Sequence, residues 1–140
     1  MGESSDERPP TRTLDAAECW QRLESAPYGR IAAEAAGEID IFPVNHAVAD
    51  GTIVFRTAPG TKLLELTIRH HVAFEVDGTD GGEAFSVVVK GDAEEFDHEA
   101  EVREAEELGV TPWAPEVKDR WVRITPTEIS GRAFQLPHGV

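Results

Sequence analysis

The stretch Thr52–Leu66, TIVFRTAPGTKLLEL, changes from one structural pattern to another within a few residues. A β-type run, Thr52–Thr57, stops at Ala58-Pro59-Gly60, and a helical apolar pattern follows the pair Thr61-Lys62. A hydroxyl, a lysine and backbone N–H groups therefore converge where a strand gives way to a helix. Such a junction can hold a phosphate, because helix N-termini favour anions and Lys62 adds a positive charge. In a simpler interpretation, Thr61 only caps the helix and Lys62 is solvated.

The composition is that of an acidic globular chain, with 140 residues and a net charge of −14. This length suits one domain with a real core, and 40% apolar residues is typical of soluble domains. The acidic surface would repel nucleic acids and anionic membranes, so neither is expected as a partner. Solubility is its simplest role, and a phosphate site in such a chain has to be built locally.

Cysteine usage and hydropathy indicate a cytoplasmic protein. Cys19 is the only cysteine, so it forms no intramolecular disulfide, and its helical context favours a packed thiol over a nucleophile. No apolar run approaches the roughly 20 residues of a membrane span. The N-terminus MGESSDERPPTRT contains no signal-peptide core.

The helical signals are few. Residues 1–12 are rich in charge, Ser and Pro and are expected to be a disordered tail, which leaves 13–136 as a single domain. Thr13 is a plausible N-cap for a helix that ends near Ser25, before Pro27. Shorter helices are predicted over residues 60–69 and 99–108, and a turn over residues 112–115.

Most of the chain reads as short β-strands. The predicted runs are Tyr28–Ala35, Ile39–Ala49, Thr52–Thr57, His71–Asp77, Ala84–Phe96, Trp121–Thr125 and Glu128–Phe134. Pro43 suggests a bend or an edge position, Asp50-Gly51 a hairpin, Gly91 a bulge, and residues 78–82 a loop. Strands joined by short connections, without βαβ alternation, predict a mainly β barrel or sandwich.

The ordered series YGRIA, IDIFPVNHAV, TIVFRTAPGTKLLEL, VAFEVD, SVVVKGDAEEF and WVRITPTEISGRAF resembles the pyridoxamine 5′-phosphate oxidase-like proteins over roughly residues 14–134. The similarity is greatest to short members called nitroimidazole-resistance-like or flavin-nucleotide-binding proteins. It implies a six-stranded antiparallel Greek-key split β-barrel, and a homodimer that holds FMN between its subunits. It also implies an FMN-dependent oxidoreductase that acts on a small molecule.

The resemblance further implies which residues contact the flavin. They are Pro43, Val44 and Asn45 beside the isoalloxazine ring, Phe55, Arg56 and Thr57 along the ring and ribityl chain, Gly60, Thr61 and Lys62 at the phosphate, and Ser86 on the long strand. The chain end GRAFQLPHGV does not match the substrate-binding segment of the oxidases proper, which argues against vitamin B6 oxidation.

Two other cofactor assignments stay open. Deazaflavin F420 fits the same fold, although its polyglutamate tail suits a basic groove better than this acidic chain. A non-catalytic flavin- or heme-binding module is the other. His46 follows the segment Pro43–Asn45 and could face the flavin or the substrate, or serve as an axial ligand of a heme. His70 and His71 stand at a helix-to-strand junction without a usual metal spacing, so no metal is expected.

Overall fold

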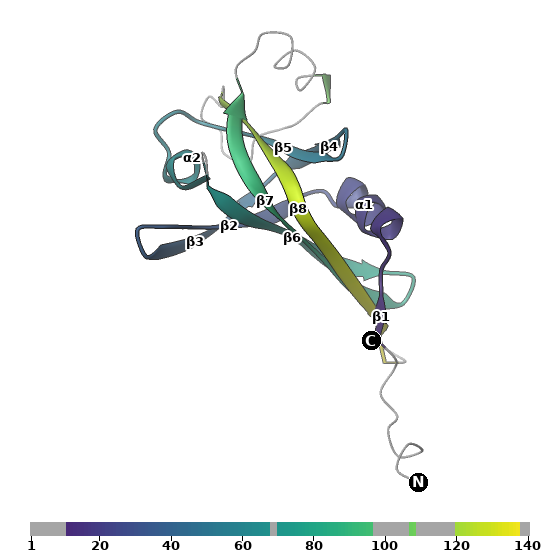
Figure 1. The fold of residues 1–140 in the computed structure, drawn as a ribbon. Coiled ribbons are helices and arrows are strands. Elements are labelled where there is room, and N and C mark those ends of the chain that lie inside the picture. Colours follow the sequence, from purple (N-terminus) through teal and green to yellow (C-terminus); the bar gives the residue numbers. More distant parts are fainter. Residues whose placement is uncertain (1–10, 68–69, 97–106, 109–119, 138–140) are drawn as a thin grey trace.

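The computed structural model describes residues 11–67, 70–96, 107–108 and 120–137, which form one antiparallel sheet with two helices packed against it (Figure 1). The strands are β1 (Thr11–Thr13), β2 (Gly29–Ala35), β3 (Glu38–Val44), β4 (His46–Ala49), β5 (Thr52–Thr57), β6 (His71–Asp80), β7 (Glu83–Phe96) and β8 (Arg120–Gln135). The helices are α1 (Ala16–Ser25) and α2 (Lys62–Thr67). Neither helix is long and apolar enough to cross a membrane.

The sheet follows the order β3-β2-β6-β7-β8-β5-β4, with β1 added to β8. Its two edges, β3 and β4, are separated in the chain only by Asn45, so the sheet curls until these edges approach without pairing. The predicted split barrel is therefore confirmed. The described residues contribute eight strands to it instead of the six expected.

Three differences explain the strand count. Thr11–Thr13 pairs with Arg132–Phe134, so the first strand begins inside the expected tail. The run Ile39–Ala49 is divided at Asn45, and Pro43 lies within edge strand β3, where its missing N–H is tolerated. The last two predicted strands are one long strand, β8, which continues through Pro126.

A β-bulge lets β8 pass through Pro126. The register shifts between Lys90 and Gly91, which face Glu128 and Pro126, so Thr127 is the extra residue on β8. Its hydroxyl donates to the carbonyl of Lys90 at 3.2 Å. A Cβ on Gly91 would lie 2.3 Å from the carbonyl oxygen of Thr125, so this position requires glycine. The bulge predicted from Gly91 is confirmed.

Helix α1 begins later than predicted, because Thr13 is held in β1 and Asp15 is the N-cap. The Asp15 carboxylate accepts from the backbone N–H of Glu18 at 2.9 Å. The helix packs Cys19 and Leu23 into the core, so the structure agrees with a packed thiol.

The main core fills the inner face of the curled sheet, and its largest side chains are Phe55, Phe74, Leu23, Ile31, Ile53 and Ile124. Helix α2 is shorter than predicted, and β6 continues into the expected loop up to a tight turn at Gly81-Gly82, where both φ angles are positive. The predicted helix over 99–108, except its last two residues, and the turn over 112–115 lie outside the described residues.

Candidate functional site

The junction between β5 and α2 is held by hydroxyl contacts. The Thr61 hydroxyl donates to the carbonyl of Ala58 at 2.9 Å and accepts from the N–H of Leu64 at 3.2 Å. Its proton is thereby used, so the buried Thr57 hydroxyl, 3.0 Å away, donates to it. Gly60 has a φ of +71°, which allows the turn that precedes α2. Thr61 thus caps α2, and the two hydroxyls fix the shape of the junction.

Lys62 lies at this junction between two carboxylates of β3. Its Nζ is 3.0 Å from Oε2 of Glu38 and 3.3 Å from Oδ2 of Asp40. Hydrogen bonds to Glu38 and then Asp40 raise the pKa of Lys62, so it stays cationic. All three groups are partly exposed, and solvent screens ion pairs of this kind so that they contribute little to stability. A phosphate that binds Lys62 would have to displace these two carboxylates, which would otherwise repel it.

The segment expected beside the isoalloxazine ring lies at the split of the barrel. Val44 is buried, Pro43 is exposed, and Asn45 connects β3 to β4. His46 is the first residue of β4 and pairs with Phe55, so Asn45 immediately precedes the end of the β4–β5 ladder. The split therefore brings the predicted ring segment close to the end of β5.

Alternation along β5 separates its three predicted residues. Phe55 and Thr57 are buried toward the core, whereas Arg56 projects from the outer face, the side of the sheet away from the main core. Its guanidinium carbon lies 4.9 Å from the ring centre of Trp121, which is a cation–π contact. Of the three, only Arg56 offers its side chain to a ligand on the outer face.

Arg56 begins a row of contacting side chains in which the rings of Trp121 and Phe96 lie between the guanidinium groups of Arg56 and Arg123. The rings of Trp121 and Phe96 are 6.3 Å apart, and the guanidinium of Arg123 lies 4.4 Å from the centre of Phe96. The two rings pack with Val54 in a small second hydrophobic cluster. This cluster was not predicted from the sequence, although the alternation of Trp121 and Arg123 in WVRIT placed both on one face.

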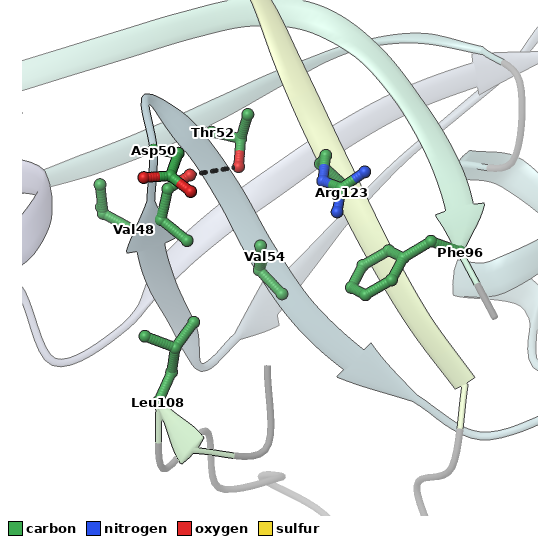
Figure 2. Close-up of a pocket in the computed structure, with 8 residues that line it drawn as sticks. Val48, Asp50, Thr52, Val54, Phe96, Leu108 and Arg123 are labelled. Atoms are coloured by element: carbon green, nitrogen blue, oxygen red, sulfur yellow. Dashed lines mark hydrogen bonds between the residues drawn. The ribbon is translucent and has the colours of Figure 1, made fainter. Parts of the chain in front are cut away.

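Beside this row is a hollow of about 600 Å³, here called the β4–β5 hollow (Figure 2). Val54, Phe96 and Leu108 form apolar walls, and in the view of Figure 2 the Phe96 ring points toward Val54. Asp50, at the tip of the β4–β5 hairpin, and Arg123, on β8, supply charges of opposite sign. The hollow is within the size range of small-molecule sites.

Ser86 lies apart from the other predicted residues. It pairs with Arg132 on β8 and lines a second outer hollow, of about 550 Å³, with Arg132 and Phe134. Three strand spacings separate β7 from β3, roughly 14 Å, so Ser86 and Pro43 cannot both touch one flavin ring edge in a single protomer.

Between these regions the outer face carries a charged cluster. Arg30 Nη1 lies 3.2 Å from Glu75 and 3.1 Å from Asp77. Burial and the neighbouring Asp77 raise the pKa of Glu75 to about 7. Ile39 and Ile41 on edge strand β3 are 69% and 65% exposed on the same face. An apolar edge strand of this kind favours contact with another chain.

His46 is engaged inside the protomer. Its Nε2 donates to the carbonyl of Leu23 at 2.7 Å, and its ring meets Phe74 edge-on at 4.8 Å. Burial lowers the pKa of His46, so it is neutral at physiological pH. His71 pairs at the surface with Asp92. Among the described residues, no three His, Cys, Asp or Glu side chains come together as metal ligands.

The curled sheet with separated edges, a short helix at the end of β5 and a cation at that junction define a protein of the split β-barrel class. Among solved structures, a Corynebacterium glutamicum protein assigned to the pyridoxamine 5′-phosphate oxidases is 42% identical, with a TM-score of 0.83 over 91% of this chain and 100% of that one. The FAD binding protein of Mycobacterium smegmatis is 40% identical, with a TM-score of 0.78 over 89% and 98%. A FAD-binding protein of Mesorhizobium loti is 26% identical, with a TM-score of 0.74 over 88% and 97%.

A family model described as pyridoxamine 5′-phosphate oxidase matches residues 15–133, and the chain belongs to this family. The Mycobacterium tuberculosis protein Rv0080 is 32% identical over 126 residues, which cover 84% of this chain and 82% of the relative. Rv3129 of the same organism is 43% identical over 85 residues, 61% of this chain and 77% of the relative. The family expected from the resemblance is thus confirmed.

Proposed function

We propose that this protein is a homodimeric flavoprotein of the cytoplasm that uses a bound flavin nucleotide to oxidise or reduce a small molecule. The observation that carries the proposal is the 40% identity, over 89% of the chain, to a split-barrel protein named for binding FAD. FAD contains the whole FMN unit, so the residues predicted for FMN apply to both cofactors. The bound flavin would supply the hydride or electron transfer.

The residues at the end of β5 fit the flavin phosphate. Lys62 offers a half-exposed ammonium that, among the described residues, pairs with the carboxylates of Glu38 and Asp40, and Arg56 adds a guanidinium on the adjacent outer face. Charge-assisted hydrogen bonds to phosphate are stronger than neutral ones. Thr57 and Thr61 use their hydroxyls within the junction, where they fix the turn that presents Lys62.

The isoalloxazine ring would lie against Pro43 and Asn45, where the barrel is split. Pro43 supplies an exposed apolar surface, and the amide groups of Asn45 can bond the polar edge of the ring. Val44 is turned into the core and would support this segment from behind. The chain thus presents apolar and polar groups together, as flavin sites require.

The homodimer is supported by the outer face. Ile39 and Ile41 form an exposed apolar stripe on an edge strand, and Phe134 is 42% exposed on the same side of the sheet. Since Ser86 lies about three strands from Pro43, we infer that Ser86 reaches a flavin only from the partner subunit.

A cofactor titration tests the proposal. Purified protein is mixed with FMN, FAD, F420 or hemin, and binding is followed by absorbance and by quenching of flavin fluorescence. We expect micromolar or tighter binding of a flavin, with Lys62→Ala weakening it about tenfold or more and the surface control Lys90→Ala leaving it unchanged. A Soret band with hemin and no flavin binding would instead support the heme module, and binding of F420 alone would support the deazaflavin enzyme.

Turnover needs a separate assay. Reduction of the bound flavin by NADH, NADPH or reduced F420, followed by reoxidation with quinones or nitroaromatic acceptors, would establish an oxidoreductase. Tight binding without reduction by any donor would leave the protein as a carrier or store of flavin, and the enzymatic part of the proposal would be wrong.

A further inference from the structure

The β4–β5 hollow lies on the same outer face as Arg56, one step along the strands. Register pairs Arg56 with Trp121, and Trp121 with Phe96, in one cross-strand row. The next row on this face contains Val54 and Arg123. At about 3.4 Å per residue, Val54 is roughly 7 Å from Arg56 along β5, and Thr52 roughly 14 Å. A ligand with one phosphate near Arg56 can therefore continue along β5 into the hollow.

We propose that the β4–β5 hollow binds the adenine end of FAD, and that this chain consequently prefers FAD to FMN. The assignment rests on the proposed flavin site at the end of β5, which would hold the flavin half and the first phosphate. The second phosphate, the ribose and the adenine would then follow the outer face of β5 toward the β4–β5 hairpin. This subsite is independent of the ring contacts at Pro43 and Asn45.

The chemistry of the hollow suits a purine. Phe96 and Val54 provide an aromatic ring and an apolar wall for a flat base, and Leu108 bounds the opposite side. Asp50 stands at the rim, where a carboxylate can accept hydrogen bonds from the 6-amino group of adenine or from a ribose hydroxyl. The Thr52 hydroxyl is used, because it donates to the carbonyl of Ala49 at 2.6 Å.

Charge on the path favours a dinucleotide over a neutral base. Arg56 and Arg123 belong to consecutive rows of this face, and each contacts an aromatic ring, of Trp121 and Phe96 respectively. Arg123 Nη1 also lies 3.9 Å from the carboxylate of Glu94, its partner in the same row, so a phosphate would compete with this carboxylate. Guanidinium groups fixed in this manner lose less freedom when they bind phosphate. Two arginines along one path match the two phosphates of FAD, whereas FMN would use only the first.

The test compares FAD with FMN in wild-type protein and in a variant that fills the hollow. Ala49 lines the hollow from β4, and Ala49→Phe places a ring in it, while Ala49→Ser is the matched control at the same position. We expect wild type and Ala49→Ser to bind FAD about ten- to a hundredfold more tightly than FMN, the effect of stacking one base. In Ala49→Phe the two affinities should become equal through loss of FAD affinity, with FMN affinity unchanged.

Competition by AMP gives a second readout that needs no variant. AMP lacks the flavin half, so at millimolar concentration it should displace FAD yet bind beside FMN without displacing it. Three results would each overturn the assignment. Wild type could bind FAD and FMN equally, Ala49→Phe could keep the preference for FAD, or AMP could fail to compete with FAD. If neither flavin binds, the proposed function itself fails, and this result differs from equal binding of both.

Discussion

Gly29, the first residue of β2, lies against the ring of Phe74 in the core. We expect Gly29→Ala to destabilise the barrel. A Cβ at this position would lie 2.3 Å and 2.8 Å from two atoms of the Phe74 ring and 2.9 Å from the carbonyl oxygen of Glu75. Phe74 is fully buried and also contacts the ring of His46, so it has little room to retreat. The carbonyl belongs to the paired strand β6 and cannot move without disturbing the β2–β6 ladder.

The expected cost is that of overpacking a closed core, about 1–3 kcal/mol. For a chain of this size, each kcal/mol lowers Tm by about 3 °C, so the melting temperature should fall by about 3–9 °C. Urea unfolding and calorimetry would measure both quantities. The matched control is Gly78→Ala on the neighbouring strand β6, whose Cβ would meet the Phe85 ring at an ordinary 3.4 Å. That change should stay within about 0.5 kcal/mol of wild type.

A double-mutant cycle identifies the clash. Phe74→Leu shortens the side chain that meets the new methyl group, so the combination with Gly29→Ala should cost less than the sum of the two single changes. Equal losses for Gly29→Ala and Gly78→Ala, or strict additivity with Phe74→Leu, would refute the reasoning from contact distances.

Three further changes test other parts of the structure. Thr61→Ala should cost about 1 kcal/mol of unfolding free energy through loss of the α2 cap, while Thr61→Ser should cost less, as measured by urea unfolding. Glu75 has a folded pKa of about 7, raised from 4.5, so the native state holds its proton more firmly and this group makes the protein less stable as pH rises from about 4.5 to 7. Glu75→Gln should reduce that fall in the urea midpoint between pH 5 and pH 8; an unchanged pH profile would contradict the shift. Ile41→Asp should move the protein from dimer to monomer in sedimentation velocity, while Glu24→Gln, on the exposed side of α1, should leave the dimer intact.

The sequence could predict elements whose signals are local. The alternation in HVAFEVD predicted β6, Asp50-Gly51 predicted the hairpin, and both of its residues have the positive φ angles that such a turn requires. Gly91 predicted the bulge, because glycine inside a strand commonly marks one. The order of these elements, compared with a known family, predicted the split barrel.

Features set by distant parts of the chain could not be predicted in this way. Thr13 has the chemistry of an N-cap, but pairing with Arg132 holds it in a strand and leaves the cap to Asp15. The break at Asn45 depends on where the barrel splits, which no local signal marks. Likewise, the charge of Lys62 was visible in the sequence, whereas its contacts with Glu38 and Asp40 arise only when β3 reaches α2.

The β-bulge on β8 determines which side chains of this strand face the two outer hollows. On the N-terminal side of the bulge, Trp121 and Arg123 face outward. On its C-terminal side, the outward residues are Ser130, Arg132 and Phe134. The outward positions thus change from odd to even residue numbers at Thr127. Strand side chains repeat with a period of two, and a continuous ladder would therefore turn one of the two segments inside out. It would expose either Val122 and Ile124 or Ala133, all now buried. The inserted residue thus allows one strand to bury a continuous core and still present Arg123 to one hollow and Arg132 to the other.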